Sequence, residues 1–408
     1  MTIAYKSSPI NWIILSILIL TAVGGLLWGN YRFSARNPGG NDFLPHWIGA
    51  RAFIFDGISP YSEEVALRAQ NIVLGHPAAQ GQNENRVTYP LYSELLFAPF
   101  AFIADYTLAR AVWMTVLEIS LIIISLLSLS LVKWRPPVWL LTVYFIFTLL
   151  WYHAARAVIN GNAVIIIGLL LTGAFLAIRN GRDEIAGFLL AYSTINPQLV
   201  FVIILFILFW SVSQRRWKII GWFFGSLAAL IVLGIFFIPN WITQNIWEVI
   251  RSAAYNPAGT LGEVLGGWMP GIATQLKWGI TILFGLILFW EWWSARQKDF
   301  TWFLWTASLT LVVSQWIGIP TNPGNFIFLF PALVLILSGW DKRWKKHGNW
   351  IALTAILILL LGLWSLSLNY TSQLAQDPIM FIPFPAFLLF GLYWIKWWIV
   401  RPARLVLE

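Results

Sequence analysis

An aspartate and a histidine lie four residues apart in the segment Asn41–Phe53, which follows the first long apolar run. Side chains at this spacing share one face of a helix, so Asp42 and His46 are expected to lie together. A carboxylate can accept a proton from a hydroxyl group as a general base, and an imidazole can orient a substrate or contact phosphate. Asp is also a preferred N-cap, so the residues alone leave helix capping and catalysis open for Asp42.

The composition indicates where such a site would sit. Of the 408 residues, 59% are hydrophobic and 11% are charged, and cysteine is absent. This apolar content excludes a disordered chain, and the lack of cysteine excludes disulfides and thiolate metal sites. The net charge of +9 comes from small basic clusters between long apolar runs, which argues against nucleic-acid binding. A polytopic membrane protein remains.

The apolar runs predict an all-α fold with about 12 membrane spans in a single membrane domain, residues 1–408. A first outer loop, residues 29–90, is expected to carry short helices, and a second long outer loop covers residues 239–271. The short apolar segment Leu91–Ala104 is interpreted as a re-entrant or interfacial helix. The expected spans are Ile10–Trp28, Tyr106–Val132, Val138–Tyr152, Val164–Ile178, Ile185–Thr194, Leu199–Val212, Ile219–Ile238, Ile272–Trp290, Phe300–Ile317, Phe326–Trp340, Trp350–Leu368 and Pro383–Val400.

Polar residues interrupt these runs at two places. Asn196 lies in the break Ser193–Gln198, and Asn322 and Asn325 lie before the run that starts at residue 326. A broken helix at membrane depth is tolerated where it is buried in protein or lines a cavity. We therefore expect these amides to line a cavity, with helix capping as the alternative. Glu118, inside a span, is a further candidate, and pairing with a neighbouring helix is its alternative.

The distribution of Lys and Arg predicts the orientation in the membrane. Alternate loops carry 17 of the 26 basic residues together with six acidic ones, a net charge of +11, and the rest of the chain carries −2. Because cytoplasmic loops are enriched in Lys and Arg, both termini are expected in the cytoplasm. The candidate chemistry then faces outward, and we expect a multi-pass protein of the plasma (inner) membrane.

Several short features follow one another in a recognisable order. They are Asp42 soon after the first span, the turn Gly57…Pro60-Tyr61, Tyr89-Pro90 before an apolar segment, Gly161-Asn162-Ala163-Val164 at the start of a span, Gly181-Arg182 followed by Ala186-Gly187, and Asn196-Pro197 at the polar break. This order resembles glycosyltransferase family 87. Asn162 stands where the family has glutamine, Asn196 where it often has lysine, and Asn322 and Asn325 where members often carry histidine.

The resemblance implies a GT-C fold and an inverting transfer of a hexose, mannose in the characterised cases, from a polyprenyl-phosphate donor to a lipid or glycan acceptor. It implies that Asp42 is the general base. His46 would contact the acceptor or the phosphate, with pairing to Asp42 as its alternative. Tyr61 and Tyr89 could stack on sugars or anchor the chain at the interface. Besides donor and acceptor, membrane lipids are the expected partners, and no metal or other cofactor is implied.

The departing phosphate of such a donor needs cations or hydrogen-bond donors. Among the basic residues on the expected outer side, we favour Arg156, Arg251 and Lys277, with contact to lipid headgroups as the alternative for each. Arg156 lies in the same short loop as Asn162, whose amide could donate to sugar or phosphate.

Two other functions share the polytopic form. A flippase or transporter for lipids or lipid-linked glycans would need polar residues through the full depth of the membrane, whereas this sequence concentrates them near one side. A glycan polymerase or ligase would differ in the size of its product and in using a diphosphate donor.

Overall fold

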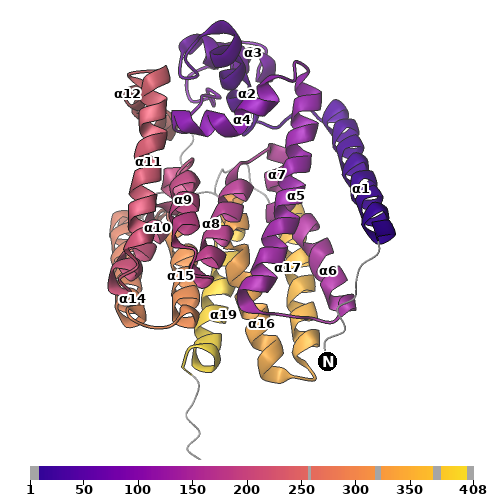
Figure 1. Ribbon diagram of the computed structural model, residues 1–408. Coiled ribbons are helices and arrows are strands. Elements are labelled where there is room, and N and C mark those ends of the chain that lie inside the picture. The colour runs from indigo at the N-terminus through magenta and orange to yellow at the C-terminus, as the bar shows by residue number, and fades with distance from the viewer. Residues whose placement is uncertain (1–8, 256–258, 318–322, 371–377, 402–408) are drawn as a thin grey trace, which may run out of the picture.

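The computed structural model describes residues 9–255, 259–317, 323–370 and 378–401, and their regular elements are helices. Long helices form a bundle, and short helices form a cap over one end of it (Figure 1). Each of the predicted apolar runs falls on a helix, which confirms the all-α membrane fold.

Seven helices in the described part of the chain are long and apolar enough to cross a membrane, or eight when one bent pair is included. The expected count of about 12 is therefore not confirmed, because several runs form helices of 10–17 residues. The long helices are α1 (Pro9–Arg36), α5 (Tyr106–Val132), α11 (Trp217–Phe237), α14 (Ala273–Ala295), α16 (Phe330–Trp344) with the preceding 3-10 helix η4 (Pro323–Leu329), α17 (Gly348–Tyr370), and α19 (Pro383–Ile399) with the short α18 (Pro378–Phe381).

The first helix, α1, continues to Arg36, eight residues beyond the predicted end at Trp28. Its polar continuation packs against α5, where the Asn30 amide donates to the Glu118 carboxylate at 2.8 Å and to the Thr115 hydroxyl at 3.1 Å. Glu118 is thus paired with a neighbouring helix. The first outer loop is shorter than predicted because these polar residues have partners on α5.

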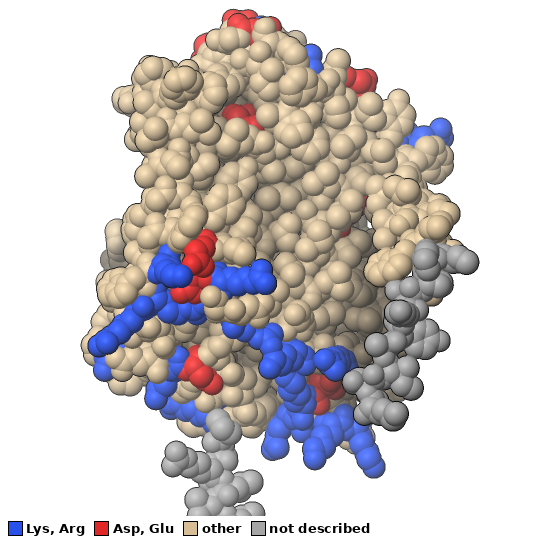
Figure 2. Space-filling view, in the orientation of Figure 1, with Lys and Arg blue, Asp and Glu red and all other residues tan. Residues whose placement is uncertain are grey.

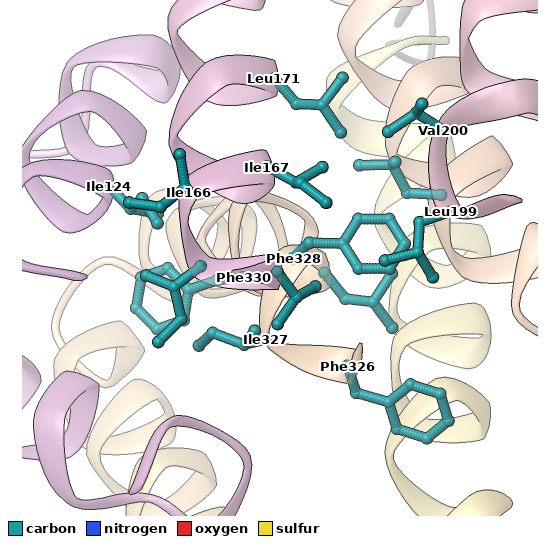
Figure 3. Packing of buried hydrophobic residues seen from close by; sticks show 14 of the residues in the cluster. Ile124, Ile166, Ile167, Leu171, Leu199, Val200, Phe326, Ile327, Phe328 and Phe330 are labelled. Atoms are coloured by element: carbon teal, nitrogen blue, oxygen red, sulfur yellow. The ribbon is translucent and has the colours of Figure 1, made fainter. Parts of the chain in front are cut away.

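Shorter helices fill the centre of the bundle. α6 (Val138–Leu150) and α7 (Tyr152–Asn160) are bent by 43° at their junction. α8 (Val164–Arg179) contacts α7, and the remaining short helices are α9 (Asp183–Ser193), α10 (Pro197–Ser213) and α15 (Phe300–Ser314). Figure 3 shows buried side chains of α5, α8, α10 and η4 meeting in this core, Ile124, Ile167, Leu199 and Phe328 among them.

The cap consists of short helices from both predicted outer loops. α2 (Leu44–Arg51) continues into the π-helix η1 (Ala52–Asp56) and is followed by α3 (Glu63–Val73). The short 3-10 helix η2 (Leu91–Ser93) and α4 (Glu94–Ala101) lie across the end of the bundle, as expected for an interfacial helix (Figure 1). The second loop adds α12 (Trp241–Tyr255), which contacts η2, whereas its α13 (Leu261–Gly266) and η3 (Pro270–Ile272) pack against α14.

Charged side chains divide between the two ends of the molecule. Lys and Arg gather at the end opposite the cap, and acidic side chains are prominent on the cap (Figure 2). The expected separation of charge along the bundle is therefore present, and which end faces the cytoplasm stays a prediction.

A buried ion pair joins α14 to α19 within the bundle. The Lys396 ammonium group contacts both oxygens of the Glu291 carboxylate at 2.6 and 2.7 Å, and both residues are buried. The ammonium group also lies 4.5 Å from the centre of the Trp305 ring. Removing one partner would leave the other charge buried and unpaired.

Glu291→Ala is expected to destabilise the protein by about 3–5 kcal/mol, the usual result of breaking a buried ion pair. The double variant Glu291→Met with Lys396→Met should recover most of the loss, because both charges are removed together. Thermal unfolding of the purified proteins in detergent measures both effects. A single variant that melts like the parent would contradict the importance of this pair.

Candidate active site

The candidate site lies where the cap meets the bundle and is assembled from segments far apart in the chain. Asp42 precedes α2, Tyr89 precedes η2, Arg156 lies on α7, and Asn162 and Asn196 precede α8 and α10. The charges of His46 and Arg156 act on Asp42, and the Asn162 side chain is hydrogen-bonded to it. The structure thus brings together residues separated by more than a hundred positions.

The segment that carries Asp42 is fixed to the end of α7. The Asp42 backbone N–H donates to the Asn160 carbonyl at 3.0 Å. The Tyr106 hydroxyl donates to the carbonyls of Gly39 and Gly40, at 2.9 and 3.1 Å. The buried Arg110 guanidinium donates to the Asn37 and Ile159 carbonyls, which joins this segment to α7. The backbone of Asp42 is therefore held in place independently of its carboxylate.

The structure does not use Asp42 as a helix cap. α2 begins at Leu44 with Phe43 as its N-cap residue, and no side chain caps it. The alternative that Asp42 caps this helix is therefore wrong, because the chain enters α2 one residue later and Pro45 occupies its first turn. The Asp42 carboxylate remains free for another purpose. In α3, by contrast, a side chain caps the helix, since the Ser62 hydroxyl accepts from the Val65 N–H.

Asp42 is exposed on one side and crowded by protein on the others. Loss of solvation raises the pKa of its carboxyl group from 3.8 to about 6, and the charges of His46 and Arg156 and the Asn162 hydrogen bond offset this only in part. A carboxylate with a pKa near 6 is ionised at neutral pH and still binds a proton well. These are the properties of a general base.

His46 lies beside Asp42 but makes its hydrogen bond elsewhere. Its Nδ1 atom is 3.2 Å from a Glu94 oxygen of α4, and its ring stacks on Phe97 at 4.5 Å and lies 4.4 Å from the Tyr89 ring. Burial raises the pKa of Glu94. Glu94 was not among the predicted site residues, although a lone carboxylate in the apolar segment Leu91–Ala104 is the signal that could have revealed it.

The amide side chains contribute polar groups from the bundle. Asn162 accepts from the Val164 N–H at 2.9 Å and donates to the Asn325 side chain at 3.3 Å. The buried Asn196 gives α10 no side-chain cap and instead hydrogen-bonds Tyr89. Its predicted alternative role as a cap is therefore not observed. Asn322 lies outside the described residues.

The two tyrosines have different surroundings. Tyr89 is half-buried, and the charge of Asp42 adds to the desolvation that raises the pKa of its hydroxyl group. Tyr61 is buried, and its hydroxyl donates to the Tyr89 carbonyl at 2.7 Å, so it helps to hold the Tyr89 backbone in place. Asn245 of α12 donates to the same carbonyl at 3.0 Å.

The three predicted phosphate-binding cations are not equivalent. Arg156 is exposed, stays near Asp42 and donates to the Tyr152 hydroxyl at 2.9 Å. Arg251 lies 3.7 Å from Glu63 and 3.6 Å from Glu248. Lys277 is paired with Glu263 at 2.6 Å. Nearby carboxylates balance the last two charges, which leaves Arg156 as the cation of this site.

Two helices point their first turns at the site. α8 begins just after Asn162, and α10 begins just after Asn196. Unpaired N–H groups and the helix dipole make such ends favourable for an anion. No three His, Asp or Glu side chains of the described segments gather closely enough to hold a metal ion. The arrangement can accept a proton at Asp42 and stabilise an anionic group beside Arg156.

Gly161, the residue after the end of α7, packs against the segment that carries Asp42. Its φ is +72°, and a Cβ atom placed there would lie 2.6 Å from the Cβ atom of Phe43. Its carbonyl accepts from the Trp113 indole at 2.8 Å, and the same indole stacks on the Phe43 ring. A side chain at this position would push on the residue next to Asp42.

Gly161→Ala is therefore expected to cost roughly 1–2 kcal/mol for the left-handed backbone and about 1–3 kcal/mol more for the clash. Gly181→Ala is the matched control, because Gly181 has φ +70° and nothing within 4 Å of an added Cβ. Thermal unfolding compares the two variants. Equal melting temperatures would show that the contact with Phe43 is unimportant.

A family model described as glycosyltransferase family 87 matches residues 88–315, more than half of the chain. No match was found among curated proteins or among solved structures.

Proposed function

The chain belongs to glycosyltransferase family 87, and from this we propose that it is a membrane enzyme that moves a hexose from a polyprenyl-phosphate donor to a lipid or glycan acceptor with inversion. Mannose is the expected sugar, and the GT-C fold is the expected class. The observation that carries the proposal is Asp42, a partly enclosed carboxylate whose pKa is raised to about 6, beside the exposed Arg156.

In the proposed reaction, Asp42 accepts the proton of an acceptor hydroxyl group. The hydroxyl oxygen attacks the anomeric carbon on the face opposite the phosphate, and the bond from that carbon to the phosphate oxygen breaks. Arg156 and the N–H groups at the start of α8 and α10 receive the negative charge of the departing phosphate. Asn162, Asn196 and Tyr89 bind sugar hydroxyl groups.

The surroundings of the site suit a lipid-linked donor. Large apolar side chains on α1 and α11, such as Leu20 and Phe236, are 71% and 81% exposed and match lipid rather than water. A polyprenyl tail can stay among such surfaces while its phosphate reaches the cap. We further propose that the cap faces the outside and the basic end the cytoplasm of a plasma membrane.

Asp42→Asn should reduce transfer by about 100- to 10,000-fold, the usual contribution of a general base. In the parent enzyme, kcat/KM should rise as the pH increases through about 6 and then level off, because Asp42 must be ionised. Reconstituted vesicles with a radiolabelled polyprenyl-phosphate hexose measure both. Asp56→Asn is the control, since Asp56 lies in the same loop and pairs with exposed Arg68.

The same variant separates a catalytic from a structural role for Asp42. The pKa of the folded state is raised above 3.8, so ionisation above about pH 6 opposes folding. Asp42→Asn should therefore melt at the parent temperature or higher at pH 7.5. Full activity would refute the role as base, and a lower melting temperature would indicate a structural role. Movement of labelled lipid without release of its sugar would instead favour a flippase.

Arg156→Gln should raise the KM for the donor by roughly 10- to 100-fold, since a hydrogen bond to a charged group contributes about 1.5–3 kcal/mol. Arg251→Gln and Lys277→Gln should leave that KM within about twofold, because carboxylates already balance both cations. Steady-state kinetics with varied donor tests the contrast. If Arg251→Gln raises the KM as much as Arg156→Gln, the assignment of the phosphate site is wrong.

A further inference from the structure

A hollow lies at the end of the bundle opposite the cap, where α5, α8, α16 and α19 end and α15 begins. It has a volume of about 890 Å³, and its apolar surface includes Leu304, Leu335 and Trp398. A second hollow of about 620 Å³ adjoins it and shares Lys133 and Arg179 with it. The site around Asp42 is remote from both, because α8 begins beside that site and ends at Arg179.

The cations around these two hollows have no acidic side chain among the residues that line them. The cations are Lys133, Arg135, Arg179, Lys342, Arg343 and Lys345. None of them forms an ion pair within the described part of the chain. Asp341 is the neighbouring carboxylate, and one of its oxygens accepts from the Trp134 indole at 2.8 Å. The charges of Asp341, Lys133 and Arg179 all act on Lys342, so this one carboxylate stands beside a cluster of six cations.

A buried hydroxyl group adds an independent observation. Ser338 lines the larger hollow and is 1% exposed, and its Oγ atom has no hydrogen-bond partner among the described residues. A buried hydroxyl without a partner costs free energy and needs an explanation, and a polar ligand in the adjoining hollow would provide one. The Arg343 guanidinium lies over the Trp398 ring at 5.2 Å, which holds one of the cations at the rim.

Orientation in the membrane alone does not explain this arrangement. The positive-inside effect requires Lys and Arg in the loops, and it does not require them to surround a hollow with an apolar floor. Basic hollows between membrane helices are suited to the phosphate groups of anionic lipids. We propose that this hollow binds the headgroup of an anionic phospholipid from the adjacent leaflet, with phosphate among the cations and acyl chains along the apolar floor.

The shape and charge favour a lipid with more than one negative charge. Six cations surround the joined hollows, and the apolar floor suits acyl chains rather than water. Cardiolipin, which carries two phosphates on one glycerol bridge, is therefore the probe of choice. Inorganic pyrophosphate has similar charge without acyl chains and distinguishes a lipid from a soluble phosphate.

Native mass spectrometry of the full chain in detergent, titrated with cardiolipin, tests the proposal. The triple variant Lys133→Gln, Arg343→Gln and Lys345→Gln should bind cardiolipin on the order of 100-fold more weakly than the parent. The control triple, Arg182→Gln, Lys298→Gln and Lys346→Gln, loses the same charge outside both linings and should bind within about twofold of the parent.

Ser338→Ala provides a second variant that removes no hydrogen bond within the described residues, and it should also weaken cardiolipin binding with an unchanged melting temperature. Phosphatidylcholine with the same acyl chains should not compete. Equal losses in the pocket and control triples would overturn the proposal, as would displacement of cardiolipin by pyrophosphate at equal concentration. Because no sugar transfer is measured, these outcomes are independent of the role assigned to Asp42.

Discussion

The position of the candidate site depends on one contact, in which residues 37–43 pack onto the end of α7. The N–H group of Asp42 binds the Asn160 carbonyl, and Arg110 ties Asn37 to Ile159. With the backbone fixed by these bonds, the Asp42 carboxylate stays next to the Asn162 amide without contributing to the attachment itself. Because the Asp42 carboxylate does not hold the segment in place, it can lie where burial disfavours its ionised form. A general base needs a pKa raised in this way.

The cations near the cap are of two kinds: some are paired with carboxylates, and others are available to a ligand. Arg86 pairs with Glu63, Glu84 and Glu248 and fixes α12 to the first loop, so it serves the architecture of the cap. Arg156, in contrast, faces Asp42 across a partly open space. Where protein replaces water on part of that space, the two charges act on each other more strongly, because the effective dielectric constant is lower. Under the proposed function, the base and the phosphate ligand could therefore cooperate although they come from different segments at the junction between cap and bundle.

Composition was sufficient to predict the helices, because each apolar run must satisfy its own backbone hydrogen bonds in a membrane. The end of α1 was misplaced, since the partners of Asn30 lie on α5, more than 80 residues later in the chain. The same limit applies to the site. Asp42, His46, Arg156, Asn162 and Asn196 carried local signals and do come together. Glu248, three residues before Arg251 on the same helix, was a local signal that could have revealed one pairing. Glu63, in contrast, reaches Arg251 only after the cap has folded, and Glu263 reaches Lys277 only when α13 packs on α14.

The shortness of α8 has a consequence for the surrounding bilayer. Its 16 residues span about 24 Å, whereas the hydrocarbon layer is about 30 Å thick. One end of this helix lies at the active site and the other at the basic hollow. If the basic end is level with one surface, the amide-lined floor of the site sits below the opposite surface, or the bilayer thins around the protein. Under the proposed function, hydrophobic mismatch would shorten the path of a lipid phosphate to Asp42, and membrane thickness would then help determine substrate access.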